Sequence, residues 1–250
     1  MKIIDAFWEK RNLGVTCYEL QMNLTDGLKE VEEKLESLKE RQYMVAKIPS
    51  ARYDLVQLFQ NKGYTFIETA IKLEYNYKKL GYKLPDMAKG LKKICDRCSR
   101  AVMDESELFR LSSEIKKGIF KTDRIYIDPE FTHEQAARRY DLWVKDLVKQ
   151  GNIPHKVLFD GETVGFFINR ECAPKTYDGM LAGVYSGYEG TGMGYCIQYA
   201  GILDALQRGM DKYIGHISGN NPAVLKIMVS LNFPIKELEY VFIKHNNKGE

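Results

Sequence analysis

Apolar and polar positions in the first third of the chain alternate between the spacing of a strand and that of a helix. Strands are predicted at 15–24, 43–48 and 64–74, and amphipathic helices at 26–42 and 53–59. Asp26 and Ser50 precede the two helices as N-cap residues, and Gly63 ends the second one. This order of elements predicts a small β-α-β-α-β unit.

The segment 76–100 is richer in lysine, glycine and tyrosine and has weaker periodicity, with Gly81 and Pro85 as breakers. We interpret this part of the chain as a linker between a smaller N-terminal α/β domain and a larger second domain. The predicted division is 1–80 for the small domain, 81–105 for the linker and 106–250 for the large domain.

The second half of the chain predicts helices, a hairpin and further alternating elements. Helices are predicted at 106–118, 132–150 and 195–208, and strands at 155–160, 162–170, 180–185, 213–218 and 240–244. Thr132-His-Glu-Gln135 matches a capping box, and Asp160-Gly161 joins the hairpin. Asn221-Pro222 opens a last helix. The tail 245–250 is polar and predicts no element.

Composition and charge exclude several classes of protein. Of the 250 residues 44% are hydrophobic, and 37 basic and 34 acidic residues leave a net charge of +3. This near balance provides no field for nucleic acid, and no apolar stretch approaches the roughly 18 to 20 residues that span a bilayer. The N-terminus lacks the apolar run of a signal peptide. We predict a cytoplasmic protein with no nucleic-acid or membrane partner, and the sequence leaves a monomer and a homodimer both open.

The five cysteines are odd in number and scattered, which predicts reduced thiols rather than a disulfide framework. Cys95-Asp-Arg-Cys98 has the spacing of half a zinc site or of a redox pair. No second cysteine or histidine pair follows at ligand spacing, and no strand-to-helix turn precedes it. We interpret the pair as two thiols on a helix, and we predict no metal.

The motif Glu189-Gly-Thr-Gly-Met-Gly194 lies between a predicted strand and a predicted helix. At such a turn several backbone N–H groups converge on one point and bind a pyrophosphate, because glycines allow positive φ and close approach. Ordinary tight turns use the same residues, so the spacing alone leaves both interpretations open. A dinucleotide-binding turn is the rival, but it opens the first strand of a long alternating unit and needs an acid that ends a strand, whereas Asp211 precedes one.

The segment Val184-Tyr-Ser-Gly-Tyr-Glu-Gly-Thr-Gly-Met-Gly194 resembles the acetyl-CoA pyrophosphate loop of the GNAT superfamily of N-acetyltransferases. The segment 217–233 is similar to that family's next strand and helix, which an asparagine caps. The resemblance implies an α/β (α+β) GNAT fold with a mixed, mostly antiparallel sheet, and acetyl-CoA as a substrate. The implied acetyl-CoA-binding residues are Val184, Tyr185, Glu189, Gly190, Thr191, Gly192, Met193, Gly194 and Asn221.

The chain also resembles the TDP-fucosamine acetyltransferases, which acetylate the 4-amino group of a nucleotide-linked deoxysugar for cell-surface polysaccharide. Phe7-Trp8 and the turn 61–68 are similar to their N-terminal domain, and 122–131 with the following helix to their Asp-Arg-Phe segment and Tyr-x-x-Trp helix. The resemblance implies an amino sugar nucleotide as acceptor. The side chains that would contact it are Arg138, Arg139, Tyr140 and Trp143, although core packing of the two aromatic residues is the stronger expectation.

Two positions depart from the family pattern. Glu189 stands where glutamine or arginine is usual, and an acid beside a pyrophosphate repels it by about 1 kcal/mol. We expect its side chain to point to solvent. Met228 stands where the family has a tyrosine that protonates the departing thiolate. A thiol pKa near 8.5 lets the thiolate leave without a donor. The candidate donors are Tyr185, His216, Tyr240 and Ser230, each of which also fits a structural role.

The implied reaction is direct attack of a neutral amine on the thioester, so the site needs an acceptor pocket, an oxyanion donor and a proton route. A splay between the strand ending near Tyr185 and the strand beginning at Tyr213 would admit the pantetheine arm, and a backbone N–H at 184–185 would face the thioester oxygen. Two other functions stay open: a GNAT enzyme acting on a small amine or a peptide N-terminus, and a non-catalytic acyl-CoA-binding module.

Overall fold

The computed structural model describes residues 1–39 and 41–246, so residues 247–250 of the polar tail lie outside the described residues. The strands form one ten-stranded sheet in the order β1-β2-β3-β10-β4-β9-β8-β7-β6-β5. The strands are β1 (Lys2–Asp5), β2 (Cys17–Gln21), β3 (Tyr43–Pro49), β4 (Thr65–Asn76), β5 (Cys98–Val102), β6 (Pro154–Phe159), β7 (Glu162–Ala173), β8 (Thr176–Val184), β9 (Lys212–Ser218) and β10 (Ile235–His245). Only β2–β3 and β8–β9 pair in parallel, which confirms the mixed, mostly antiparallel sheet.

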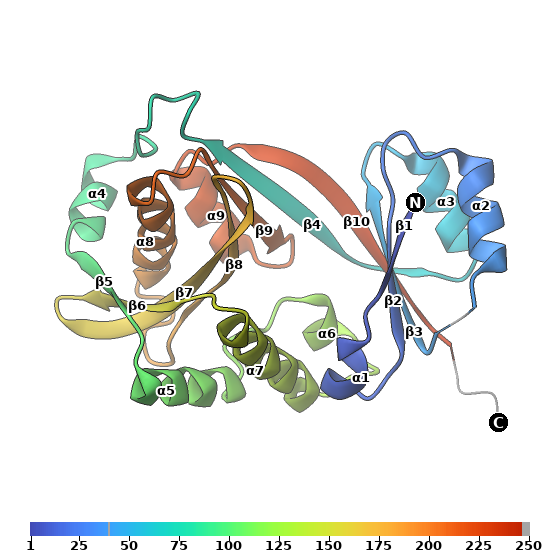
Figure 1. Ribbon diagram of the computed structural model, residues 1–250, viewed down its shortest axis with the longest axis horizontal. Coiled ribbons are helices and arrows are strands. Elements are labelled where there is room, and N and C mark those ends of the chain that lie inside the picture. The colour runs from blue at the N-terminus through green and yellow to red at the C-terminus, as the bar shows by residue number, and fades with distance from the viewer. Residues whose placement is uncertain (40, 247–250) are drawn as a thin grey trace.

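Helices cover both faces of this sheet (Figure 1). They are α1 (Trp8–Asn12), α2 (Leu28–Ser37), α3 (Tyr53–Asn61), α4 (Lys89–Cys95), α5 (Glu105–Lys116), α6 (Arg124–Ile127), α7 (His133–Lys149), α8 (Met193–Gln207) and α9 (Pro222–Ser230). Helices α1, α5, α6 and α7 pack on one face, and α2, α3, α4, α8 and α9 pack on the other.

Side chains of β3 and β10 alternate between the two faces of the sheet and contribute to the core on each face. Tyr43 and Val45 pack toward α6 and α7, whereas Met44, Ala46 and Ile48 pack toward α2 and α3. Successive side chains of a strand point to opposite faces, so a strand covered on both faces reads as a continuous apolar run. Segment 43–48 is apolar except for Lys47, and the strand predicted there is confirmed.

Two long strands, β4 and β10, run diagonally between the two halves of the molecule in Figure 1. β10 pairs with β3 on one side and with β4 on the other, so the last strand lies inside the sheet and joins the halves. The segment 81–105 contains α4, which packs against α8, and β5, which forms the far edge of the sheet. The division of the chain into two domains stays a prediction, because a single sheet crosses it.

The first residues of the helices show which of the predicted N-caps form. Thr132 accepts from the Gln135 N–H at 3.1 Å while Gln135 accepts from the Thr132 N–H, which confirms the capping box of α7. Asn221 caps α9 as predicted. The predictions for Asp26 and Ser50 were wrong, since α2 starts after Gly27 and α3 after Arg52 without side-chain caps. Asp26 instead accepts from the Asn23 N–H and pairs with the terminal amine.

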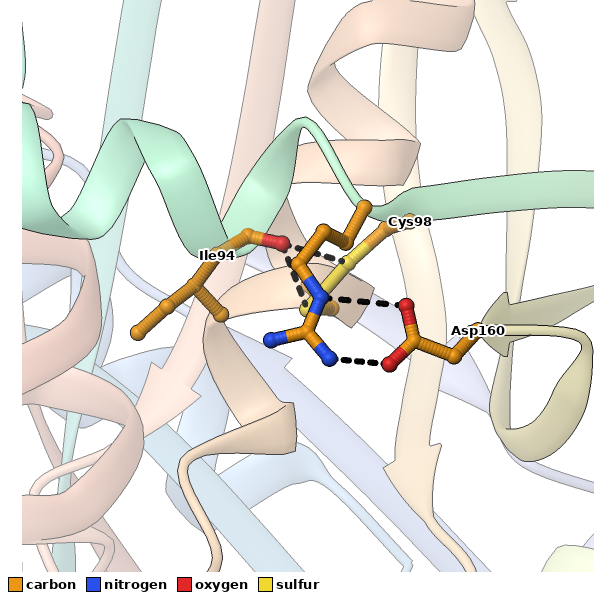
Figure 2. The surroundings of a disulfide bond; sticks show 5 residues. Ile94, Cys98 and Asp160 are labelled. Carbon is orange, nitrogen blue, oxygen red and sulfur yellow. Dashed lines mark hydrogen bonds and ion pairs between the residues drawn. A yellow bond between two sulfur atoms is a disulfide. The ribbon is translucent and has the colours of Figure 1, made fainter.

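A disulfide joins Cys98 of β5 to Cys196 of α8, with their Cα atoms 6.0 Å apart (Figure 2). The prediction of reduced thiols was wrong for this pair, because the fold brings together two residues 98 positions apart in the chain. The carbonyl of Ile94, in the last turn of α4, lies 3.4 Å from the Cys98 sulfur. The bond ties the first turns of α8 to the edge of the sheet, and Cys95 beside it is a buried free thiol.

Candidate active site

The parallel strands β8 and β9 pair only over their first residues. The register runs from Thr176 opposite Lys212 to Gly179 opposite Gly215, and no pair follows among the described residues of these two strands. Beyond this point β8 stays paired with β7 up to Val184, and β9 stays paired with β4 up to Ser218. The two strands therefore diverge toward their C-terminal ends, at the place where the resemblance to the GNAT superfamily implied a splay.

The edge of β8 that faces this opening carries backbone groups that β7 does not use. The Tyr185 N–H donates to the Val164 carbonyl at 2.9 Å, which makes Val184 and Gly165 a non-hydrogen-bonded pair of the antiparallel ladder. In such a pair the N–H and C=O groups point away from the partner strand. The N–H of Val184, rather than that of Tyr185, is thus the donor that points into the opening.

The glycine-rich loop connects the end of β8 to the start of α8. Gly187, Gly190 and Gly192 have φ values of +92°, +74° and +87°, and a Cβ at any of them would meet no atom within 4 Å. The loop is therefore left-handed in backbone and open on its outer side, a shape that suits a ligand lying against the main chain. The first N–H groups of α8, at Met193 and Gly194, have no acceptor within the helix, so the loop presents donors and the positive end of the helix dipole.

Two predicted loop residues make contacts within the loop itself. The Thr191 N–H and hydroxyl both donate to the Tyr188 carbonyl, at 3.3 and 2.6 Å, and so brace the turn. The exposed Glu189 side chain folds back, and its Oε2 accepts from the Gly187 N–H at 2.7 Å. The Glu189 carboxylate therefore accepts a hydrogen bond from a backbone N–H of its own loop while remaining in contact with solvent.

Helix α9 closes the other side of the loop. A Cβ at Gly194 would approach the Cδ1 of Ile227 to 2.7 Å, so this glycine allows α8 and α9 to pack closely. The Asn221 Oδ1 accepts from the Val224 N–H at 3.1 Å and is used as a cap. Met228 is 2% exposed and packs in the core with Leu73, so its side chain does not reach the opening.

The opening between β8 and β9 leads into a cleft of about 810 Å³ on the α7 side of the sheet. Met180 of β8 and His216, Ile217 and Ser218 of β9 form its inner end. Its other walls come from α1, α6 and α7 and from strands β2, β3, β4 and β10. Small-molecule sites are typically clefts of about 300–1,000 Å³, so the volume suits a substantial organic molecule.

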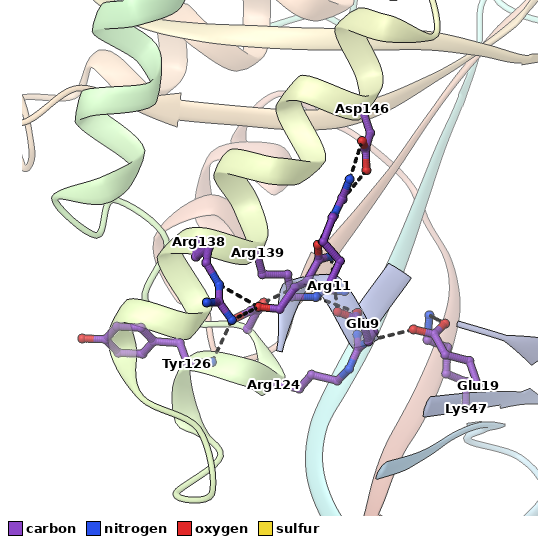
Figure 3. A network of polar contacts seen from close by, with 11 residues as sticks. Glu9, Arg11, Glu19, Lys47, Arg124, Tyr126, Arg138, Arg139 and Asp146 are labelled. Atoms are coloured by element: carbon purple, nitrogen blue, oxygen red, sulfur yellow. Dashed lines mark hydrogen bonds and ion pairs between the residues drawn. The ribbon is translucent and has the colours of Figure 1, made fainter. Parts of the chain in front are cut away.

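A network of ion pairs builds the wall of the cleft away from the opening (Figure 3). Arg124 of α6 donates to Glu19 of β2 at 2.7 Å, and Arg139 of α7 pairs with the fully buried Glu9 of α1 at 2.8 Å. Arg11 of α1 forms a two-point pair with Asp146 of α7. These contacts hold α1, α6 and α7 against the first strands, so the cleft wall is largely preformed.

The structure separates the acceptor residues suggested by the sequence. Arg138 donates twice to the Asn12 carbonyl, at 2.6 and 3.0 Å, and does not line the cleft, so the expectation that it contacts a ligand is replaced by a structural role. Arg139, Tyr140 and Trp143 do line it. Tyr140 is also stacked on Phe120 with ring centroids 4.2 Å apart, so one ring serves both the core and the cleft wall.

Of the candidate proton donors, only His216 lies in the cleft. Its side chain is about half exposed, and its Nδ1 is 3.6 Å from the Asp178 carboxylate. Tyr185 is 1% exposed, its hydroxyl has no partner among the described residues, and burial raises its pKa. Tyr240 packs on the α2–α3 side of the sheet. Ser230 donates to the Lys226 carbonyl and lies 3.4 Å from the Tyr195 hydroxyl, at the outer end of α9.

Sequence reasoning missed Glu68 as a functional residue. It lies in β4, lines the cleft, and accepts a hydrogen bond from the Ser218 hydroxyl at the inner end. The sequence offered no distinguishing signal, because the same strand also contains Lys72 and Glu74 and only the fold shows which of its polar side chains is buried. Burial raises the pKa of its carboxyl above the ordinary value.

No protein-family model and no curated protein matches this chain. Solved structures match its fold at low identity. A GCN5-related N-acetyltransferase from Sphaerobacter thermophilus matches with TM-score 0.57 and 11% identity over 86% of this chain and 64% of that chain, which is less than two thirds of its length. One from Kribbella flavida matches with TM-score 0.57 and 13% identity over 93% and 82%. A fungal glucosamine N-acetyltransferase region within a multi-domain β-N-acetylglucosaminidase matches with TM-score 0.55 and 11% identity over 81% and 25%.

At these identities the comparisons establish the fold, and the chain has the fold of the GCN5-related N-acetyltransferases. In the part of the chain that the structure describes, no helix is both long and apolar enough to cross a membrane.

Proposed function

We propose that this protein is an acetyl-CoA-dependent N-acetyltransferase that transfers the acetyl group to an amine by direct attack on the thioester. The observation that carries the proposal is the divergence of β8 and β9 beyond Gly179 and Gly215. It opens the sheet between the glycine-rich loop and the cleft. A thioester held in this opening would present its carbonyl carbon to an amine in the cleft.

The residues of the chain suit the two ends of acetyl-CoA. The N–H groups of Gly190, Gly192, Met193 and Gly194 would hold the diphosphate at the start of α8, where the loop is open and the helix dipole favours negative charge. The Val184 N–H points into the opening and would donate to the thioester oxygen as negative charge develops there. Because CoA thiolate is a good leaving group, the buried Met228 does not argue against turnover.

We further propose an amino sugar linked to a nucleotide as the acceptor. The size of the cleft, the aromatic Trp8 and Trp143 and the cationic Arg11 and Arg170 on its walls support this choice, because rings stack on bases and sugars and cations pair with phosphates. The fungal region of the same fold is described as a glucosamine N-acetyltransferase.

The test is thiol release from acetyl-CoA with TDP-4-amino sugars, UDP-amino sugars, simple amines and a peptide as acceptors. We expect saturable release with an amino sugar nucleotide and no transfer to the peptide. Transfer to simple amines or to the peptide alone would replace the acceptor and keep the enzyme. Tight acetyl-CoA binding without release in any arm would identify a non-catalytic acyl-CoA-binding module.

Replacing Glu189 by glutamine is expected to tighten acetyl-CoA binding about fivefold at low salt. The amide oxygen still accepts from the Gly187 N–H, while removal of the charge beside the diphosphate recovers about 1 kcal/mol. Calorimetric titration gives the dissociation constants. Glu171→Gln is the matched control, because Glu171 also accepts from a backbone N–H, that of Lys175, in an exposed turn. Weaker binding in Glu189→Gln would show that the charge supports the loop.

A further inference from the structure

Buried carboxylates in this protein are paired with cations, with one exception. Among the described residues the buried acids are Glu9, Glu19, Glu68, Glu114, Asp128, Asp141, Asp178 and Asp204. Their partners are Arg139 for Glu9, Arg124 and Lys47 for Glu19, Lys117 for Glu114, His245 for Asp128, Lys145 for Asp141, Arg170 and His216 for Asp178, and Arg100 and Arg208 for Asp204. Within that same part of the chain Glu68 forms no ion pair, although it is 7% exposed.

A buried carboxylate without a cation is costly, so the exception calls for a physical reason. Among residues 1–39 and 41–246, the one hydrogen-bond partner of the Glu68 side chain is the hydroxyl of Ser218, the residue at which β9 ends. The carboxylate has further acceptor capacity, since an ionised carboxylate accepts about four hydrogen bonds. It lines the cleft next to the opening between β8 and β9, where the acceptor amine would have to stand.

The charges that surround Glu68 come from every element packed around the inner cleft. They are Asp123, which caps α6, Arg124 of α6, Lys47 of β3, Glu19 of β2, His216 of β9, Arg139 of α7 and Arg170 of β7. Arg124 and Lys47 lie closer to Glu19, which they pair with at 2.7 and 3.6 Å. Burial raises the pKa of Glu68, while Arg124 and Lys47 oppose this shift and Asp123 adds to it. Glu68 is thus a buried carboxylate that feels Arg124 and Lys47 at a distance but has no ion pair of its own among the described residues, so a cation in the cleft would stabilise its charged form.

We propose that Glu68 binds the ammonium group of the acceptor and takes its proton, and this inference rests on the proposed function. One proton passes from nitrogen to the carboxylate, which leaves a neutral amine with a free electron pair. The nitrogen–carbon bond forms at the thioester carbonyl, the carbon–sulfur bond breaks, and the sulfur leaves with the electron pair. The second nitrogen proton goes to that thiolate, and Glu68 returns its proton to solvent. Ser218 positions the carboxylate.

The test compares Glu68→Gln with Glu74→Gln, a control on the same strand whose carboxylate pairs with Lys212 outside the cleft. We expect Glu68→Gln to lower kcat/KM for the acceptor by about 100- to 1,000-fold, the range of general base catalysis, and to remove the acid limb of the pH profile. The dissociation constant for acetyl-CoA should change less than twofold. Glu74→Gln should match the wild type in all three measurements.

Thermal unfolding without ligands gives a readout that does not depend on turnover. A carboxyl whose folded pKa is raised above its unfolded value near 4.5 stabilises the fold below that value and loses this contribution as the pH rises through the folded pKa. Glu68→Gln should therefore have a higher Tm than the wild type at pH 8 and a similar Tm at pH 4. A carboxylate with a purely structural role predicts a lower Tm at pH 8.

Each outcome of these measurements either establishes or overturns the role of Glu68. An active wild type whose Glu68→Gln variant keeps its kcat/KM and its acid limb would overturn the inference and leave the proposed function standing. A lower Tm of the variant at pH 8 would also overturn it. A wild type that binds acetyl-CoA but acetylates no amine would overturn both. Loss of kcat/KM with retained acetyl-CoA binding and a raised Tm at pH 8 would establish it.

Discussion

Replacement of Arg124 by methionine should lower the free energy of unfolding by about 3–5 kcal/mol at pH 7, the usual cost of leaving one buried charge without its partner. Arg124 is 8% exposed and donates to Glu19, which is equally buried. Lys47 at 3.6 Å is the only other cation near Glu19 among the described ion pairs. Urea unfolding followed by circular dichroism measures the loss.

The double variant Arg124→Met, Glu19→Gln is the control, because it also removes the Glu19 charge, which the single variant leaves buried without its main partner. It should recover at least half of the lost stability. A single variant that costs less than about 1 kcal/mol would mean that the pair behaves like a solvated surface pair, for which such values are typical.

The pH dependence of the same pair has a definite sign. Burial alone would raise the pKa of Glu19, but Arg124 and then Lys47 lower it to about 2. A carboxyl with a lowered folded pKa stabilises the fold above its unfolded value of 4.5, and this contribution is lost as the pH falls toward 2. The wild type should therefore lose more stability in acid than Arg124→Met does.

Gly192→Glu should weaken acetyl-CoA binding about 100-fold. Gly192 precedes α8 with φ at +87°, a conformation that costs a non-glycine residue about 1–2 kcal/mol, and the added carboxylate would repel the diphosphate by about 1 kcal/mol or more. Together these terms approach the 2.7 kcal/mol of a 100-fold change. Calorimetric titration with acetyl-CoA measures it.

Gly118→Glu is the control that separates the effect of backbone strain from the loss of the acetyl-CoA site. Gly118 follows α5 with φ at +84° and has equally open surroundings, but it lies outside the loop. It should lose stability without losing affinity for acetyl-CoA. If the Gly192 and Gly118 variants bound acetyl-CoA with equal affinity, the glycine-rich loop would not be the binding site of the diphosphate.

Local signals in the sequence predicted the structural elements on the glycine-rich side of the candidate site. These elements are the glycine-rich loop and the cap at Asn221, and the capping box at Thr132 was predicted in the same way. Each depends on residues a few positions apart, so it can be predicted from neighbouring residues in the sequence. The splay between β8 and β9 was implied by the resemblance to the GNAT superfamily and not by the residues of the two strands. Glu189 was expected to face solvent, and it does so while accepting from its own loop.

Most of the cleft could not be predicted, because it depends on contacts between distant segments; of the residues that line it, the resemblance named only Arg139, Tyr140 and Trp143 in advance as acceptor contacts. Glu68 meets Ser218 across 150 positions, and Arg124 meets Glu19 across 105. The helices α1 and α6, with five and four residues, are too short to give a periodic pattern, yet they carry Arg11 and Arg124 to the cleft. The pairing of Cys98 with Cys196 was hidden for the same reason.

The place of β10 inside the sheet has a consequence for how the chain is made. Residues 1–76 emerge from the ribosome with β3 and β4 both complete, but these strands are not neighbours, and the strand that fits between them is synthesised about 160 residues later. Until then both strands present unpaired edges, which are prone to pair with other chains. The gap between β3 and β4 is thus filled only after residues 235–245 have been translated, and we expect slow folding and a need for chaperone protection during synthesis.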